Sequence, residues 1–282
     1  MKIILLVLII TTTFFYTPVF GQNSVDYLKI DIMLARGEYE KVIDTCKQVL
    51  ATDSLNSEIY YKMGLAYQNF LPDDKSFDFF LQAFALAPDN NLFKYMVAKG
   101  YFNKSKNNLA KPLLQSLCSA DSMNWSYAYY LTSIYLQEGK YDESIEIYKR
   151  FYNRDSANYI VIDKMGFAFL RKGEFTRSID LFNRSLALNK KNNNAIKNLA
   201  YLYSNTHKID TAIQLLTRGI KTEPTDMDLY ARRATLSFST NTNKRALNDY
   251  PKILGTAASA LLYITIPVHG PTNHLQPHAA TV

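Results

Sequence analysis

One pattern of small and large side chains returns along the chain with a period of about 34 residues. No other feature constrains the fold as much. When a unit is started at Ser57, its eighth residue is small and its eleventh is aromatic in nearly every copy. The small eighth residues are Gly64, Ala98, Thr132, Gly166, Ala200 and Ala234. The aromatic eleventh residues are Tyr67, Tyr101, Tyr135, Phe169 and Tyr203. Because residues three apart share one face of a helix, the first half of each unit is predicted to be helical.

A second pair of small and large positions marks the other half of each unit. The small twentieth residues are Ser76, Ala110, Ser144, Ser178, Ala212 and Ala246. The large twenty-fourth residues are Phe80, Leu114, Tyr148, Phe182, Leu216 and Tyr250. Each unit is therefore predicted to hold two helices, with the large side chains of one helix packed over the small residues of the other.

Turn residues separate these predicted helices. Gly37, Gly139 and Gly173 fall between the two helices of a unit, where Gly permits the left-handed backbone that ends a helix. At the unit boundaries, Pro88 and Pro224 can begin a helix but cannot continue one. The Asp-Ser pairs at 53–54, 121–122 and 155–156 are interpreted as helix caps at the same junction.

Two segments carry a resemblance to a known family. Tyr60-x-x-Met63-Gly64-x-x-Tyr67 and Leu131-x-x-x-Tyr135-x-x-x-Gly139-x-Tyr141-x-x-Ser144-x-x-x-Tyr148 resemble the tetratricopeptide repeat. The resemblance implies an all-α fold, a right-handed superhelical solenoid of about seven antiparallel helix-turn-helix repeats over residues 22–256. The predicted units are 23–56, 57–90, 91–124, 125–158, 159–192, 193–226 and 227–256.

Some segments depart from the repeat. The first unit has Lys29 and Ile30 where a large apolar and a small residue are expected, which suits an end cap. Pro112 and Pro251 fall inside second helices and are predicted to kink or shorten them. Residues 257–282 form an irregular C-terminal tail, interpreted as disordered or as the altered end of a longer array.

The N-terminus has the pattern of a signal peptide. Lys2 is followed by the apolar run Ile3–Ile10, and Val19-Phe20-Gly21 provides a small-residue cleavage context, so residues 1–21 are predicted to be removed. A retained membrane anchor is the alternative, weakened by Pro18. We expect the mature chain to be exported to the periplasm or cell surface, without an integral membrane span.

Charge and cysteine content exclude some classes of function. The net charge is +7, but the 32 basic residues are scattered among 25 acidic ones, so nucleic acid is not an expected partner. Cys46 and Cys118 are predicted to be buried free thiols, because the register places them two repeats apart.

The resemblance also implies a concave groove lined by the first helices, which would bind a peptide or another protein. Register transfers this role to Tyr61, Gln68, Asn69, Tyr95, Lys99, Phe102, Asn103, Tyr129, Gln137, Phe167, Arg171, Lys197, Tyr201 and Asn205. Some relatives clamp a C-terminal carboxylate with Lys, Asn and Arg. Here Tyr201 stands where that clamp needs Asn, and the neighbouring unit offers Asp163, so we expect the clamp to be absent.

No residue set suited to catalysis, metal binding or a cofactor emerges from the register, so the chain is not expected to be an enzyme. His269, His274 and His278 lie in the Pro-rich tail without framing ligands. Asp-Ser/Thr-apolar motifs in predicted exposed turns resemble the protein O-glycosylation acceptor of Bacteroidetes-type bacteria, with helix capping as the alternative reading. The candidate acceptors are Ser54, Ser122, Ser156 and Thr211.

The sequence thus predicts a non-catalytic protein-binding scaffold of the bacterial cell envelope. Two alternatives stay open. The chain could be a structural subunit that docks by its convex face or tail, or the non-catalytic part of a longer enzyme. The oligomeric state and the identity of the partner are not defined by the sequence.

Overall fold

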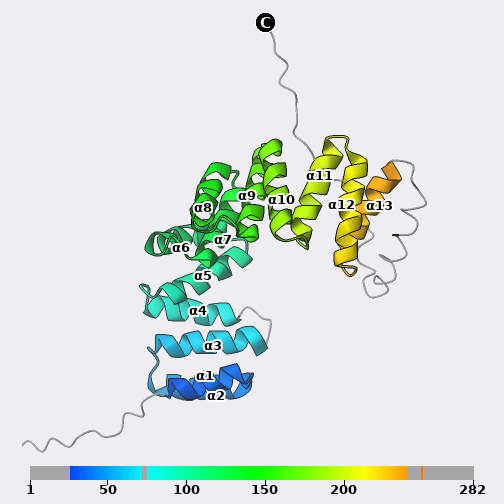
Figure 1. The fold of residues 1–282 in the computed structure, drawn as a ribbon. Helices are drawn as coiled ribbons and strands as arrows, with labels where there is room; N and C mark the ends of the chain where they lie inside the picture. Colours follow the sequence, from blue (N-terminus) through cyan, green and yellow to red (C-terminus); the bar gives the residue numbers. More distant parts are fainter. Residues whose placement is uncertain (1–25, 71–74, 240–248, 250–282) are drawn as a thin grey trace, which may run out of the picture. The chain divides into compact units, whose positions relative to one another are not determined.

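A computed structural model describes residues 26–70, 75–239 and 249, and these residues form thirteen α-helices and no strand. The described residues divide into two compact units, unit 1 before and unit 2 after the boundary between residues 105 and 106. Figure 1 shows the helices of both units with their labels. The boundary falls inside the predicted repeat 91–124, at the turn between its two helices. The prediction of an all-α fold is confirmed.

In unit 1 each helix packs mainly against the next helix along the chain. The helices are α1 (Tyr27–Ala35), α2 (Tyr39–Thr52), α3 (Ser57–Phe70), α4 (Lys75–Leu86) and α5 (Asn91–Asn103). A cluster of buried side chains from α1, α2 and α3 forms part of the core, including Ile30, Val42 and Ile59. Ile30, an irregularity of the first repeat, is thus a core residue.

Unit 2 follows the same plan over a longer stretch, and α9 also contacts α11, the first helix of the next repeat. Its helices are α6 (Asn107–Ala120), α7 (Trp125–Gln137), α8 (Tyr141–Arg154), α9 (Tyr159–Lys172), α10 (Phe175–Leu188), α11 (Asn193–Asn205), α12 (Ile209–Thr222) and α13 (Met227–Ser239). Leu199, Leu216 and Leu229 lie in one core cluster that joins α11, α12 and α13.

The predicted packing of small against large side chains is found between the helices of a repeat. A Cβ added to Gly64 would lie 2.5 Å from the ring of Phe80, and one added to Gly166 would lie 3.1 Å from the ring of Phe182. Where the small residue is Thr132, Tyr148 at the large position donates a 2.8 Å hydrogen bond to its hydroxyl. The eighth residue therefore sets how closely the two helices approach.

Five repeats have a described turn between their two helices, and each of these turns uses left-handed backbone. Gly37, Gly139 and Gly173 have φ values of +74°, +75° and +87°, which confirms their predicted role. Ser105 and His207 stand at the equivalent positions of other repeats and have φ values of +57° and +60°. These two residues adopt a conformation that side chains with a Cβ disfavour.

The N-caps at the repeat boundaries differ from the prediction, which placed the Asp-Ser pairs there. The N-caps are Asn residues such as Asn90, Asn124 and Asn158, whose side chains accept from backbone N–H groups of the next helix. Asp121 and Asp155 instead are the C-caps of α6 and α8, and each accepts from the N–H two residues ahead. The Asp-Ser pairs therefore shape the turn, because only the last residue of the unit is placed to reach the first free amides of the next helix.

Two other predictions are only partly right. Pro112 lies inside α6, yet α6 has 14 residues, as α8 does, so the expected shortening is wrong. Cys46 and Cys118 are free, but Cys118 is half-buried rather than buried. Burial raises the pKa of both thiols to about 11, which leaves them weak nucleophiles.

Several predictions fall outside the described residues: the signal peptide 1–21, Pro251, the tail 257–282 and the histidines His269, His274 and His278. None of the helices in the described parts of the chain combines the length and the apolar character needed to cross a bilayer.

Candidate functional site

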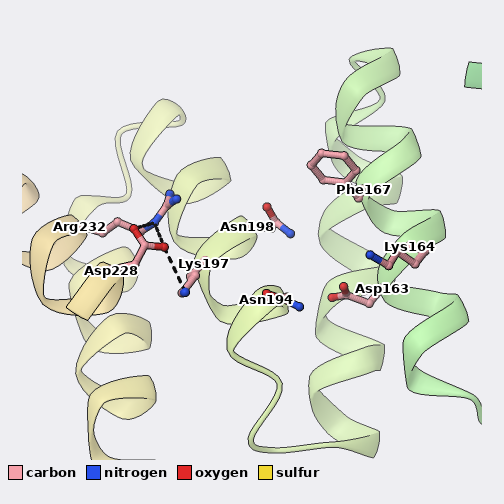
Figure 2. A pocket seen from close by; sticks show the side chains of 8 residues that line it. All are labelled: Asp163, Lys164, Phe167, Asn194, Lys197, Asn198, Asp228 and Arg232. Atoms are coloured by element: carbon pink, nitrogen blue, oxygen red, sulfur yellow. Dashed lines mark hydrogen bonds and ion pairs between the residues drawn. The ribbon is translucent and has the colours of Figure 1, made fainter. Parts of the chain in front are cut away.

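A pocket of about 360 Å³ in unit 2 is lined by α9, α11 and α13, the first helices of three successive repeats (Figure 2). Charged side chains predominate, with two amides and one aromatic ring. The lining residues are Asp163, Lys164, Phe167, Asn194, Lys197, Asn198, Asp228 and Arg232.

The repeat register explains why these residues meet. Asp163 and Lys197 are the fifth residues of successive repeats, and Asn194 and Asp228 are second residues. Repeats of equal length that stack on one another bring equal positions side by side. The sixth residues of the same three repeats are Lys164, Asn198 and Arg232.

The charges on the α11–α13 side of the pocket neutralise one another. The Lys197 ammonium lies 2.8 Å from a carboxylate oxygen of Asp226 and 3.1 Å from one of Asp228. The Arg232 Nε lies 3.0 Å from both carboxylate oxygens of Asp228. Burial disfavours the charged form of Lys197, but the two carboxylates outweigh it and raise its pKa. Burial likewise opposes ionisation of Asp228, but the hydrogen bonds and charges of Arg232 and Lys197 together outweigh it, so the pKa of Asp228 is lowered.

The α9 side of the pocket contains a carboxylate of a different kind. Asp163 is only 7% exposed, and its Oδ1 accepts a 3.1 Å hydrogen bond from the Asn192 amide. That amide also donates to Ser185 Oγ, which donates to the Tyr159 carbonyl. Burial raises the pKa of Asp163 to about 6, although the Asn192 hydrogen bond and the charge of Lys164 act against the shift.

Two amide side chains face this carboxylate across the pocket. Asn194 and Asn198 lie one turn apart on α11, and Figure 2 shows both pointing towards α9. Neither side chain forms a hydrogen bond with any residue that the structure describes. Their donors and acceptors are therefore available to a ligand.

Aromatic rings lie near the polar pocket on the same first helices. The Arg171 guanidinium lies 6.0 Å from the ring centre of Phe167. The Lys164 ammonium lies 5.1 Å from that of Tyr129 on α7. Tyr129 and Tyr201 are themselves exposed. Rings on a polar surface supply contact area at a small cost in side-chain entropy.

A second pocket of about 450 Å³ adjoins the first, since both are lined by Asp163, Lys164 and Asn194. It extends towards the turns before α11 and α13, where the Asn193 amide donates a 2.7 Å hydrogen bond to Glu223. The two pockets form one continuous polar surface on unit 2.

One family profile and several solved structures are similar to this chain. The tetratricopeptide repeat family profile matches residues 130–154, within α7 and α8. The fold is therefore similar to that of tetratricopeptide-repeat proteins. Comparison with curated protein sequences gave no match.

Solved tetratricopeptide-repeat structures are similar. YrrB, described as a tetratricopeptide-repeat protein with an unusual peptide-binding site, has a TM-score of 0.52 and 13% identity, over 70% of this chain and 97% of that chain. TTC0263, a tetratricopeptide-repeat protein of Thermus thermophilus, has a TM-score of 0.52 and 16% identity, over 64% of this chain and 99% of that chain. A chain of the APC/C hetero-tetramer Cut9–Hcn1 has a TM-score of 0.58 and 15% identity, over 83% of this chain and 46% of that chain.

The tetratricopeptide-repeat register places the predicted groove residues of unit 2 on first helices, and two of them, Phe167 and Lys197, line the pocket. Gln137 is engaged elsewhere, because its side-chain oxygen accepts a 2.6 Å hydrogen bond from Asn107 of α6. The other predicted residues on these helices are Tyr129, Arg171, Tyr201 and Asn205. Lys197 is itself paired with two aspartates, Asp226 and Asp228.

The predicted groove residues of unit 1 lie on α3 and α5. The Tyr61 side chain packs against other rings of the array. Its ring centre lies 5.3 Å from that of Phe93 and 6.0 Å from that of Phe80. The Asn69 amide donates to the Leu65 carbonyl of its own helix at 2.8 Å. The remaining residues of this group are Gln68, Tyr95, Lys99, Phe102 and Asn103.

Six residues of the pocket were missed by sequence reasoning. The groove was assigned to the second, fifth, ninth, twelfth and thirteenth residues of each repeat. Asp163, Asn194 and Asp228 stand at second or fifth positions, so the register itself could have found them. The sixth position was not counted as part of the groove, and it supplies Lys164, Asn198 and Arg232.

The candidate glycosylation acceptors are all exposed. Ser54, Ser122 and Ser156 lie in turns after α2, α6 and α8, as predicted. Thr211 does not: it lies in the first turn of α12, where the next residue, Ala212, is buried in the core. The helix extends over this motif because Ala212 is one of the small residues on which the repeat packs.

Proposed function

We propose that the chain is a non-catalytic interaction scaffold that binds a peptide, or an extended segment of a partner protein. The binding face would be the one formed by α7, α9, α11 and α13, the first helices of the repeats in unit 2. The observation that carries the proposal is the pair Asn194 and Asn198, whose amides point across a pocket and have no hydrogen-bond partner among the described residues. A side-chain amide both donates and accepts, as a peptide group does.

The spacing of the two amides supports a backbone ligand. Asn194 and Asn198 are four residues apart on α11, which corresponds to about 6 Å along a helix axis. Alternate residues of an extended peptide are separated by about 6.6 Å. One amide can therefore form hydrogen bonds with one peptide group, while the other amide does so with the next peptide group that faces the same way.

The exposed rings of Tyr129 and Tyr201 complete this face, because they offer apolar contact to side chains of a bound segment. The similar structure of YrrB is described as having a peptide-binding site, which supports the same use of the fold here.

The proposal places the chain outside the cytoplasm, in the periplasm or at the cell surface of a bacterium. Support comes from the signal-like residues 1–21 and from the exposed Asp-Ser motifs at Ser54, Ser122 and Ser156. Mass spectrometry of the protein from its native host tests this. A mature chain that begins at Gln22 is expected, and a chain that keeps Met1 would contradict cleavage.

A second candidate is docking through the second helices, as in a structural subunit. Leu109, Phe175 and Leu188 favour it, since each is an exposed large apolar side chain on a second helix of unit 2. Photo-crosslinking in the native host separates the two functions. A photoreactive phenylalanine analogue replaces Tyr201 in one variant and Phe175 in the other, so that both probes are matched in size.

The scaffold proposal expects the partner to crosslink through position 201 and not through position 175. Substituting Asn194 and Asn198 with Ala in the first variant should remove the crosslink, whereas Asn183→Ala and Gln214→Ala, exposed amides on second helices, should leave it unchanged. Crosslinking through position 175 alone would contradict the proposal and favour the structural subunit.

A further inference from the structure

The charges of the pocket are unevenly paired. Asp228 is held by Lys197 and Arg232, and Asp226 by Lys197. Asp163 has no ion-pair partner among the described residues, although it is more than nine-tenths buried. Its Oδ1 accepts from the Asn192 amide, and its Oδ2 accepts no hydrogen bond from the described chain. A buried carboxylate that lacks a cation is costly, unless a ligand supplies the cation.

The cations that line the 360 Å³ pocket with Asp163 are engaged elsewhere. Lys164 lies over the Tyr129 ring and forms no ion pair with Asp163, as expected for neighbours in a helix, whose side chains point in different directions. Lys197 on α11 and Arg232 on α13 are held by the aspartates of α13 and of the turn before it. The other charged residues lining the two pockets are Lys191 and Glu223.

The pocket also suits the stem of a long basic side chain. Asp163 and Phe167 lie one turn apart on α9, and in Figure 2 both point into the space between α9 and α11. The stems of Lys and Arg pack well on an apolar ring while the charged group reaches a polar partner.

We propose that this pocket selects an extended segment that carries a Lys or Arg side chain, with the cation bound by the Asp163 carboxylate beside the ring of Phe167. This inference rests on the proposed function, because it names the ligand chemistry of the same site. The charge of the segment decides its affinity, since Asp163 is the one carboxylate lining the 360 Å³ pocket that the described residues leave without a cation.

The test compares three acetylated, amidated nonapeptides that have Ser and Ala at every position except the centre. The centre is Arg, its neutral isostere citrulline, or Glu. The full mature chain, labelled with ¹⁵N, is titrated with each peptide, and the side-chain amide signals of Asn194 and Asn198 are followed by NMR. The Arg peptide is expected to bind about tenfold or more tightly than the citrulline peptide, as a charge-assisted hydrogen bond predicts.

The Asp163→Asn variant, which keeps the acceptor for Asn192, should bind the Arg and citrulline peptides equally. Asp180→Asn, which removes an exposed carboxylate from the second helix α10, should bind as the original chain does. Lowering the pH from 7.5 to 5 should weaken binding of the Arg peptide to the original chain but not to Asp163→Asn, because the pKa of Asp163 is about 6.

Equal binding of the Arg and citrulline peptides, or preference for the Glu peptide, would overturn the inference while the crosslinking result still supported a peptide-binding face. Absence of binding by all three peptides would overturn it as well. Absence of a crosslink at position 201 in the chain that keeps Asn194 and Asn198, in contrast, would refute the proposed function itself.

Discussion

Asp163 shows how one residue can depart from the pattern of its repeat. The fifth residues of the three preceding repeats are Tyr61, Tyr95 and Tyr129, and none of these is fully buried. Asp163 at the same position is buried, and the Asn192 side chain in the turn before α11 donates a hydrogen bond to it. The local cost is tolerated where the carboxylate opens to a pocket, as is common at functional sites.

The raised pKa of Asp163 makes a stability prediction with a definite sign. The pKa rises from 3.8 to about 6 on folding, so the folded chain holds the proton more tightly. The contribution of the protonated Asp163 carboxyl to the free energy of unfolding is therefore fully present below about pH 4, and it is lost as the pH rises through 6. Asp163→Asn should increase the free energy of unfolding at pH 7.5 by about 2–3 kcal/mol and should have little effect at pH 4.

Urea unfolding at the two pH values measures this difference, with Asp180→Asn as the matched control. An equal effect of Asp163→Asn at both pH values would show that the carboxylate is not penalised by burial.

At the scale of elements, the turn between the two helices of a repeat has a left-handed backbone whether or not its residue is Gly. His207 adopts the conformation that Gly173 adopts in the preceding repeat. The helices α11 and α12 dictate this, because their packing fixes where the chain must turn. A residue with a Cβ loses about 1–2 kcal/mol there.

His207→Gly should therefore stabilise the chain by about 0.5–1 kcal/mol, since the strain relieved exceeds the entropy that Gly adds to the unfolded state. Gly173→Ala is the reciprocal control and should destabilise by about 1 kcal/mol. Thermal unfolding followed by circular dichroism measures both. A lower midpoint for His207→Gly would mean that the imidazole makes a contact that outweighs the strain.

At the scale of the whole molecule, the core is built from neighbouring helices, so stability is expected to be a sum of local terms. Gly64 illustrates this, because its contact with Phe80 joins α3 to α4 within unit 1. The buried clusters around Ile30 and around Leu199 likewise lie within separate units.

Gly64→Ala should destabilise the chain by about 1–3 kcal/mol, because the new Cβ would lie 2.5 Å from the Phe80 ring. Hydrogen exchange should speed up in α3 and α4 but not in α11 and α12. Combining Gly64→Ala with Phe80→Leu should cost less than the sum of the single changes. Uniform acceleration of exchange over the entire chain would contradict local stability.

Much of this organisation could be predicted because it follows from periodicity. Alternating small and large residues located the helix pairs, and Gly139 and Gly173 located their turns. N-capping was misassigned to the Asp-Ser pairs, since Asp and Asn have similar N-cap preferences and only the backbone shows which residue faces the free amides.

The repeat array, its helical register and the small residues on which it packs were thus determined by the sequence alone, because each depends on contacts that recur at fixed spacing. Which side chains line a pocket, and which charges are already paired, was decided by the tertiary structure. Lys197 was predicted as a ligand-binding cation, yet Asp226 and Asp228 hold it. Asp163 became the candidate instead, because burial and pairing are properties of three helices packed together, and one helix cannot specify them.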